Sequence, residues 1–500
     1  MELKDIEVEQ HERIDMPELT ALQKEYLLKR HGTLELDPMP SQDPADPLNW
    51  PRWKTNVNLT LVSFHALMIG FMTGGIIPAF QTMATDLGVS LNTTSYTVSI
   101  QILLLGLAPL FWAPLAERYG RRPVWLVSTL LSMVANIGCA RSTSYGTLMV
   151  ARVFQSIFNA PAGALGTAVV AELFFARERG FKIGIWTLMV TLGNPAGPLV
   201  MGFVATRVGW RWIFWIFSAT NGVQFLGYLF FSPETKYVRR TSYNGDVAAS
   251  KHTFRQKYLS FEKIPDSMPL KVSQFFVPLR LLGRLSVSIS TLAHSVIFGF
   301  CSVLICVEIP ALLGVKFGLN AEQIGLNFIA NVIGGVIGEQ LSGPFSDYIR
   351  NRRLRKNPHH QTPVPESRLW FSHPAYILCI VGFVVFLVTL DNATQNQWTV
   401  APAIGLAICA AGNQMQTTSL FTYAVDRNLA DSGGVGVSII LVRQIWSFIG
   451  PFWFPYMFDS IGLRGSAALC SALMVMFAML PTALQQFYFG PRKYNMGNGN

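Results

Sequence analysis

Residues 113–123 read Ala-Pro-Leu-Ala-Glu-Arg-Tyr-Gly-Arg-Arg-Pro, and residues 343–350 read Gly-Pro-Phe-Ser-Asp-Tyr-Ile-Arg. Each segment follows a long apolar run, and the offset from 113 to 343 is 230 residues. A small residue, a proline, an acid and arginine thus recur at the same place in two parts of the chain. Internal repeats of this kind are typical of secondary transporters, so the chain is expected to consist of two related membrane-embedded halves.

The composition excludes a soluble enzyme and indicates a membrane protein. Of the 500 residues, 50% are hydrophobic and 14% are charged, and the mean hydropathy is +0.34; soluble domains have about 25% charged residues. At about 20 residues per helix, roughly twelve spans would use about 240 residues. The net charge of +10 does not indicate a nucleic-acid partner, because the basic residues are scattered between apolar runs.

Twelve apolar runs predict an all-α integral membrane protein. The runs are continuous, whereas a membrane β-barrel shows segments of about ten residues that alternate in hydrophobicity. The predicted spans cover residues 57–80, 96–116, 122–140, 145–171, 180–206, 210–232, 283–313, 322–349, 372–390, 399–423, 434–458 and 464–489.

The distribution of basic residues predicts that both termini lie in the cytosol. Lys and Arg between spans concentrate in the loops that follow even-numbered spans. Residues 1–50 also lack the apolar core and cleavage site of a signal peptide. The predicted organisation is a cytosolic tail (1–50), a six-helix half (51–232), a cytosolic central loop (233–282), a second six-helix half (283–490) and a cytosolic tail (491–500).

The segment at 113–123 resembles the signature loop of the major facilitator superfamily, usually Gly-x-x-x-Asp-Arg-x-Gly-Arg-Arg. Ala113 replaces the usual glycine and Glu117 the usual aspartate. The likeness extends over nearly the whole chain and implies the major facilitator fold, with twelve helices in two halves around a central cavity. Charges at the inner mouth can form hydrogen bonds that hold in one conformation and break in the other. The predicted gating residues are Glu117, Arg118, Arg121, Arg122 and Asp347. The alternative is that these charges only fix the orientation.

Two further segments resemble motifs of proton-coupled and antiporter members of this superfamily. Arg152-Val153-Phe154-Gln155 is similar to an Arg-x-x-Gln motif, with Ser156 where glycine is common. An arginine in this position should face the bundle interior, and the alternative is that it snorkels to the outer headgroups. The second segment resembles a Gly-x-x-x-Gly-Pro motif and implies export, although any packed membrane helix can carry it. Its residues are Gly193, Pro195, Gly197, Pro198 and Gly202.

Shorter signatures narrow the resemblance to a branch of the superfamily. Glu172 through Gly180, Trp210-Arg211-Trp212, Pro233-Glu234-Thr235 and Asp43 through Trp50 resemble fungal drug:proton antiporter-like members. Fungal polyamine and cation transporters look similar. The resemblance therefore gives no substrate.

Ionisable residues inside the predicted spans are candidates for proton coupling, because burial favours the protonated form of a carboxylate. Glu339 is the first candidate, since Gly334 and Gly338 predict close helix packing around it. The alternative is a structural glutamate paired with Arg443 or the headgroups. Glu308 lies near the outer end of its span, where water is expected to reach it. Arg152 and His65 complete the set, and a packing role is the alternative for His65.

A substrate site should be apolar and aromatic with a few polar groups. The segment at 413–416, Asn-Gln-Met-Gln, is too polar for a lipid-facing surface. The predicted cavity residues are Asn413, Gln414, Gln416, Gln444, Trp446 and Trp186. Most aromatic residues must nevertheless face lipid or pack in the bundle.

The sequence contains no enzyme signature. A phosphate loop, a hydrolase elbow and clustered metal ligands are all absent, and the six cysteines lack ligand-like spacing, so no cofactor or metal is expected. Asn92 and Asn392 are the candidate glycosylation sites in outer loops.

These observations predict a proton-coupled secondary transporter that exports small organic molecules, such as drugs or secondary metabolites, at a fungal plasma membrane. It is expected to act as a monomer whose partners are its substrate, protons and the lipid bilayer. The alternative is proton-coupled uptake of an organic cation such as a polyamine. A transporter-like receptor is an alternative of another class.

Overall fold

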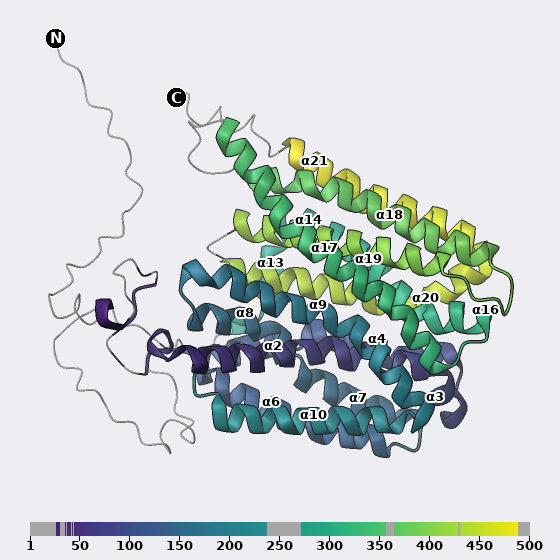
Figure 1. Ribbon diagram of the computed structural model, residues 1–500, viewed down its shortest axis with the longest axis horizontal. Coiled ribbons are helices and arrows are strands. Elements are labelled where there is room, and N and C mark those ends of the chain that lie inside the picture. Colours follow the sequence, from purple (N-terminus) through teal and green to yellow (C-terminus); the bar gives the residue numbers. More distant parts are fainter. Residues whose placement is uncertain are drawn as a thin grey trace, which may run out of the picture.

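The computed structural model describes residues 27–30, 36, 38–41, 43, 45–237, 272–356, 365–428 and 431–488, and the side chains of residues 176, 177, 180, 272, 273, 343–356, 365, 367 and 432 lie outside that description. Nearly all of the described chain is helical. Figure 1 shows the helices of residues 52–231, in purple to teal, beside those of residues 285–488, in green to yellow, with their axes along the long dimension of the molecule.

The first half begins with a short 3₁₀ turn, η1 (Pro47–Asn49), and contains six membrane passes. Two passes are broken at a proline that begins the next helix, because proline fits the first turn of a helix but not its interior. The elements are α2 (Arg52–Gly74), η2 (Ile77–Ala79), α3 (Phe80–Leu87), α4 (Leu91–Leu107), α5 (Pro109–Tyr119), α6 (Arg121–Arg141), α7 (Tyr145–Asn159), α8 (Pro161–Leu173), α9 (Ala176–Arg207) and α10 (Arg211–Phe231). The bend between α4 and α5 is 42°.

The second half follows two short helices, α12 (Val272–Phe275) and α13 (Val277–Leu281). Its first pass contains two π-helical segments. The elements are α14 (Leu285–Phe298), η3 (Gly299–Leu304), α15 (Ile305–Ile309), η4 (Pro310–Gly314), α16 (Val315–Phe317), α17 (Ala321–Lys356), η5 (Pro365–Arg368), α18 (Leu369–Asn392), α19 (Ala401–Arg427), α20 (Ser432–Met474), η7 (Val475–Met479) and α21 (Leu480–Tyr488).

The helices confirm the predicted fold of twelve passes. Length and apolarity identify nine spans in the described chain, or ten if α4 and α5 form one broken span. The last of them, Gly433–Tyr488, contains two passes, because Gly462 in α20 has non-helical backbone angles of φ 68° and ψ 177°. The remaining pass is α19, which is 27 residues long but less apolar because it carries Asn413, Gln414 and Gln416.

Most helices extend beyond the apolar runs that predicted them. The first pass begins at Arg52 rather than 57, and α17 ends at Lys356 rather than 349. Hydropathy detects only the part of a helix that lies in hydrocarbon, whereas backbone hydrogen bonding continues through the polar residues at its ends.

The two halves meet through α9 against α17 and α4 against α20. A Cβ atom on Gly202 would lie 2.6 Å from the Ala321 carbonyl oxygen, and one on Gly325 would lie 2.5 Å from the Pro198 carbonyl oxygen. The Tyr96 and Phe452 rings stack with their centroids 4.5 Å apart. These contacts lie at the predicted outer end of the bundle, so the halves are closed against each other there.

Candidate functional site

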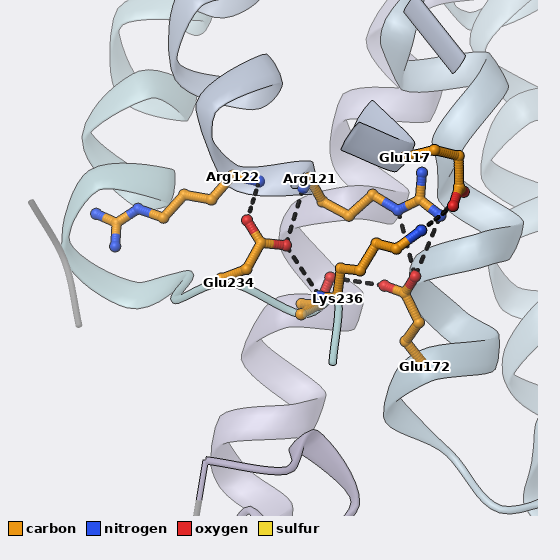
Figure 2. Close-up of polar contacts among 7 residues, drawn as sticks. Glu117, Arg121, Arg122, Glu172, Glu234 and Lys236 are labelled. Atoms are coloured by element: carbon orange, nitrogen blue, oxygen red, sulfur yellow. Dashed lines mark hydrogen bonds and ion pairs between the residues drawn. The ribbon is translucent and has the colours of Figure 1, made fainter. Parts of the chain in front are cut away.

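At the opposite, predicted cytosolic end, one carboxylate joins the turn between α5 and α6 to the segment that follows α10 (Figure 2). Glu234 accepts hydrogen bonds from the backbone N–H groups of Arg121, at 2.8 Å, and Arg122, at 3.0 Å. These N–H groups begin α6, so the carboxylate caps the positive end of the helix dipole. Gly120 has φ 95°, and a Cβ there would lie 2.3 Å from the Glu234 carboxylate. The signature glycine is therefore required for both its conformation and its size.

The guanidinium of Arg121 connects three helices. It donates to Glu117 on α5 at 2.5 Å and to Glu172 on α8 at 3.1 Å and 3.3 Å. The Arg121 side chain is 4% exposed, whereas that of Glu117 is 56% exposed. Because charge-assisted hydrogen bonds are about twice as strong as neutral ones, this buried guanidinium fixes the relative positions of α5, α6 and α8.

Lys236 and Thr235 extend the cluster beyond the helices. The Lys236 ammonium pairs with Glu117, and the Thr235 hydroxyl donates to Glu172 at 2.8 Å. Partial burial lowers the pKa of Lys236. We call Glu117, Arg121, Glu172, Glu234 and Lys236 the signature cluster.

The sequence predicted part of the signature cluster. Glu117 and Arg121 do meet, while Arg122 contributes its backbone N–H and donates through its guanidinium to the Leu229 carbonyl oxygen. Arg118 instead lies over the Tyr119 ring. The predicted gating residue Asp347 lies on α17, and its side chain is outside the described part of the structure.

Sequence reasoning missed Glu172, Glu234 and Lys236 as members of the cluster. Glu172 and Glu234 stand in segments that carry the family resemblance, which was the available signal. Their contacts with Arg121 span 51 and 113 residues of chain, and no local pattern reports a contact over such separations.

Arg152 on α7 is fully buried and makes side-chain contacts with amides rather than acids. Its guanidinium donates to Gln155 at 2.6 Å, to the Gln101 side chain, and to the Thr97 carbonyl oxygen at 3.3 Å. Gln155 in turn donates to Asn136 at 2.7 Å. Arg152 therefore does not extend to the outer headgroups, which was the snorkelling alternative. Neutral polar groups of α4, α6 and α7 surround its charge inside the bundle.

Glu339 on α17 is partly buried against α19. Its carboxylate accepts a hydrogen bond from the Gln414 side chain at 2.6 Å and a longer one from the Thr418 hydroxyl at 3.4 Å. A Cβ on Gly334 or Gly338 would lie 2.1 Å or 2.5 Å from a carbonyl oxygen of α19. The glycines thus allow the close packing that brings this acid to Gln414. In the described structure, Glu339 does not pair with Arg443.

Glu308 is more buried than its place near the outer end of the span suggests. This side chain is 4% exposed and has no hydrogen bond or ion pair with a described residue. It lies on α15, between the π-helical segments η3 and η4. The expectation rested on depth in the span, and depth does not show which neighbouring helices cover a side chain.

His65 lies in an aromatic environment between α2, α6 and α10. Its Nδ1 is 3.2 Å from the Tyr228 hydroxyl, and its ring centroid is 5.4 Å from that of Trp125. Trp125 and Tyr228 stack at 5.3 Å. These surroundings fit a hydrogen-bonded packing residue.

The predicted polar residues of α19 do not face one cavity. Successive residues are about 100° apart on a helix, so Gln414 and Gln416 point about 160° apart. Gln414 faces Glu339 on α17, whereas Gln416 approaches His294 on α14. Asn413 carries a buried Oδ1 atom without a hydrogen-bond partner.

The predicted aromatic and glutamine residues of the cavity pack against glycines. Trp186 lies against Gly166, and Trp446 lies against Gly299, where a Cβ would approach the indole Nε1 to 2.0 Å and 2.6 Å respectively. Gln444 contacts the other half, because a Cβ on Gly106 of α4 would lie 2.7 Å from the Gln444 Cβ.

The antiporter-like motif on α9 provides close packing. A Cβ on Gly193 would lie 2.1 Å from the Leu67 carbonyl oxygen, and one on Gly197 would lie 2.4 Å from that of Phe71. Both contacts are with α2. Pro195 and Pro198 lie inside the helix, and Gly202 faces α17 of the other half.

Two surface grooves are lined mainly by apolar side chains. One has a volume of about 570 Å³ and lies between α6 and α7; the other, of about 460 Å³, lies between α2 and α10. Neither groove contains Asn413, Gln414, Gln416, Gln444, Trp446 or Trp186, whereas Phe64, an aromatic residue that could also stack on a substrate, lines the groove between α2 and α10. Among the described residues, no group of three His, Cys, Asp or Glu side chains could hold a metal, and the candidate glycosylation residues Asn92 and Asn392 are exposed.

The chain is similar to fungal transporters over most of its length. It is 27% identical over 459 residues to "Efflux pump radE" of Floropilus chiversii, an alignment that covers 90% of this chain and 83% of that protein. It is 27% identical over 376 residues to "Citrate exporter 1" of Aspergillus niger, covering 70% of this chain and 71% of the exporter.

Solved structures share the fold at low sequence identity. The human organic anion transporter MFSD10 (TETRAN) matches with a TM-score of 0.57 and 17% identity, covering 87% of this chain and 100% of that one. A bacterial homologue of the human lysosomal transporter Spinster matches with a TM-score of 0.56 and 15% identity, covering 88% and 98%. The Major Facilitator Superfamily profile matches residues 62–451. The chain therefore belongs to the Major Facilitator Superfamily, and it is a multi-pass membrane transporter of small molecules rather than an enzyme.

Proposed function

We propose that this protein exports small organic molecules by alternating access, using an inward flow of protons. The observation that carries the proposal is the contact of Glu339, an acid within a membrane pass, with Gln414 and Thr418 on the facing helix. The names of the relatives, an efflux pump and a citrate exporter, support the direction of transport.

Glu339 can link proton binding to the packing of two helices. As a carboxylate it accepts from both Gln414 and Thr418 through Oε2. Protonation removes the charge and weakens these hydrogen bonds, because bonds to an ionised acceptor are the stronger ones. The contact between α17 and α19 would then differ between the protonated and ionised forms, which is what coupling requires.

The signature cluster gives the first half a rigid predicted cytosolic end. Its ion pairs lie within that half among the described residues, so they hold α5, α6 and α8 together with the segment after α10. We propose that this end moves as one body, while the small residues of α9 and α17 close the outer end. Two packed bodies that rock about a central site produce alternating access.

The test is net accumulation of labelled organic acids, cationic drugs and polyamines in yeast expressing the protein, against vector controls. Export predicts lower accumulation that rises when a protonophore collapses the gradient. Higher accumulation that falls on collapse would instead establish uptake, the polyamine alternative included. No transport of any compound, with ligand-dependent signalling, would favour a receptor.

Glu339→Gln tests the proton site. The variant should lose most gradient-driven export, by about tenfold or more if the carboxylate carries the proton, because the amide cannot titrate. Asp459→Asn is the matched control, since Asp459 is an exposed acid of the same half. Export by Glu339→Gln with unchanged pH dependence would remove Glu339 from the mechanism.

A further inference from the structure

A guanidinium and an imidazole meet inside the second half. Arg443 on α20 lies with Nη1 3.5 Å from Nε2 of His294 on α14. The guanidinium also lies over the Phe298 ring, 4.3 Å from its centroid. Stacking on an aromatic ring leaves the edge of the guanidinium, with its N–H groups, free to bind a ligand.

The hydrogen bonds at this position leave donors without acceptors. If His294 Nε2 accepts from Arg443, the neutral ring carries its proton on Nδ1. That Nδ1 atom is buried without a partner, and so is Nε of Arg443. Buried donors without acceptors are costly, and a native structure rarely leaves them so.

Gln416 adds an unpartnered amide beside His294. Its side chain is fully buried, yet neither amide atom makes a hydrogen bond of ordinary geometry. The buried hydroxyls of Ser290, one turn before His294, and Ser447, one turn after Arg443, also lack partners. Unpartnered polar atoms of α14, α19 and α20 thus lie at the Arg443–His294 contact or within one helical turn of it.

No acid neutralises Arg443 among the described residues. Glu339 accepts from Gln414, which lies on the opposite side of α19 from Gln416. A positive charge inside a membrane bundle needs a counter-charge or a water-filled space. A water molecule can accept hydrogen bonds from the free N–H groups, but it carries no negative charge. A carboxylate accepts these hydrogen bonds and also neutralises the guanidinium.

We propose that Arg443, His294 and Gln416 form a subsite that binds a carboxylate of an organic anion, which is the substrate. The inference rests on the proposed transport function and assigns its substrate class. Arg443 supplies the charge and a planar pair of donors, and His294 and Gln416 supply neutral donors. Gln444, the next residue of α20, packs against Gly106 of α4, so the subsite adjoins the interface between the halves. A bound anion can therefore influence how the halves pack.

The test is ligand binding to purified full-length protein in detergent, measured as the rise in melting temperature with citrate, benzoate or spermidine. One or both carboxylates should stabilise the wild-type protein, and spermidine should not. Arg443→Gln should raise the concentration needed for half the effect about tenfold or more, because it removes a charged hydrogen bond. Arg464→Gln is the matched control, since Arg464 is 65% exposed on the same helical element.

Stabilisation by spermidine alone, by neither carboxylate, or equally by carboxylates in wild type and Arg443→Gln would overturn the assignment. If Arg443→Gln does not give a monodisperse protein, Arg443→Lys and Gln416→Leu supply the test. Both should weaken carboxylate binding, and wild-type affinity in both would also overturn the subsite.

Binding and transport can fail separately. Ligand binding to the purified protein requires neither a proton gradient nor net transport. Carboxylate binding that depends on Arg443, in a protein that shows no export in cells, would support the subsite and contradict the proposed function. Protonophore-sensitive export of cations, with no carboxylate binding, would contradict the subsite alone.

Discussion

Glu234 shows how a single side chain can organise the end of a helix bundle. Its two oxygens accept from the first N–H groups of α6 and from the Lys236 backbone N–H at 2.9 Å. A carboxylate in this position satisfies donors that a helix cannot satisfy itself. The stability of the signature cluster therefore depends on a residue outside the signature loop.

Glu234→Ala should lower the free energy of unfolding by about 1 kcal/mol, the usual value of a helix cap. The melting temperature of the purified protein measures the change. The melting temperature of Glu234→Gln should lie between those of Glu234→Ala and the wild type, because an amide oxygen still accepts a hydrogen bond. A wild-type melting temperature in Glu234→Ala would mean that water replaces the carboxylate at no cost.

Gly88 and Gly120 both have positive φ, but only Gly120 also lacks room for a side chain. Comparing alanine variants at the two positions therefore distinguishes backbone strain from steric clash. Gly120, at φ 95°, faces the Glu234 carboxylate, whereas at Gly88, with φ 66°, an added methyl group would have no atom within 4 Å. Gly88→Ala should cost about 1 kcal/mol from strain alone. Gly120→Ala should lower the melting temperature clearly more and disrupt the cluster. Equal losses would show that Glu234 moves aside freely.

The helix α9 packs against helices of both halves through small residues. Its glycines allow contact with both α2 and α17, so a motif that resembles an antiporter signature is also a packing device. Such backbone contact is the usual source of helix association in membranes, where the hydrophobic effect between helices is absent.

Gly193→Ala should impair folding or transport strongly, because its methyl group would lie 2.1 Å from the Leu67 carbonyl oxygen. Gly184→Ala on the same helix should be neutral or slightly stabilising, since that position is open and alanine favours helix. Protein yield, melting temperature and accumulation assays on both variants provide the comparison. Wild-type behaviour of Gly193→Ala would refute this packing of α9 on α2.

The sequence predicted elements better than it predicted contacts. Apolar runs located the passes, because burial in lipid leaves a local signature about 20 residues long. The pairing of Glu234 with the start of α6 has no such signature. The burial of Glu308 was missed because depth in a span does not show which helices cover a side chain. The separate directions of Gln414 and Gln416 follow from helical periodicity, but the partners they meet follow only from the helices that surround α19.

The two halves are closed against each other at the predicted outer end by aromatic and small residues. The six cysteines are all buried, which leaves introduced cysteines as the reactive ones. Tyr96→Cys with Phe452→Cys should crosslink through a short bismaleimide and stop transport, because alternating access requires this contact to open. Either single variant is the control. Full transport after complete crosslinking would exclude opening at this position.

Gly462 gives the last two passes an unusual mechanical relation. A single residue with non-helical backbone separates two long helical stretches, and a Cβ there would meet open space. Because only one residue connects the two helices, a change in tilt of the pass that carries Arg443 should also move the pass that follows. The short connection therefore couples the tilt of one helix to that of the next. A flexible insertion after Gly462 should uncouple the two passes without changing any residue proposed to bind substrate or protons.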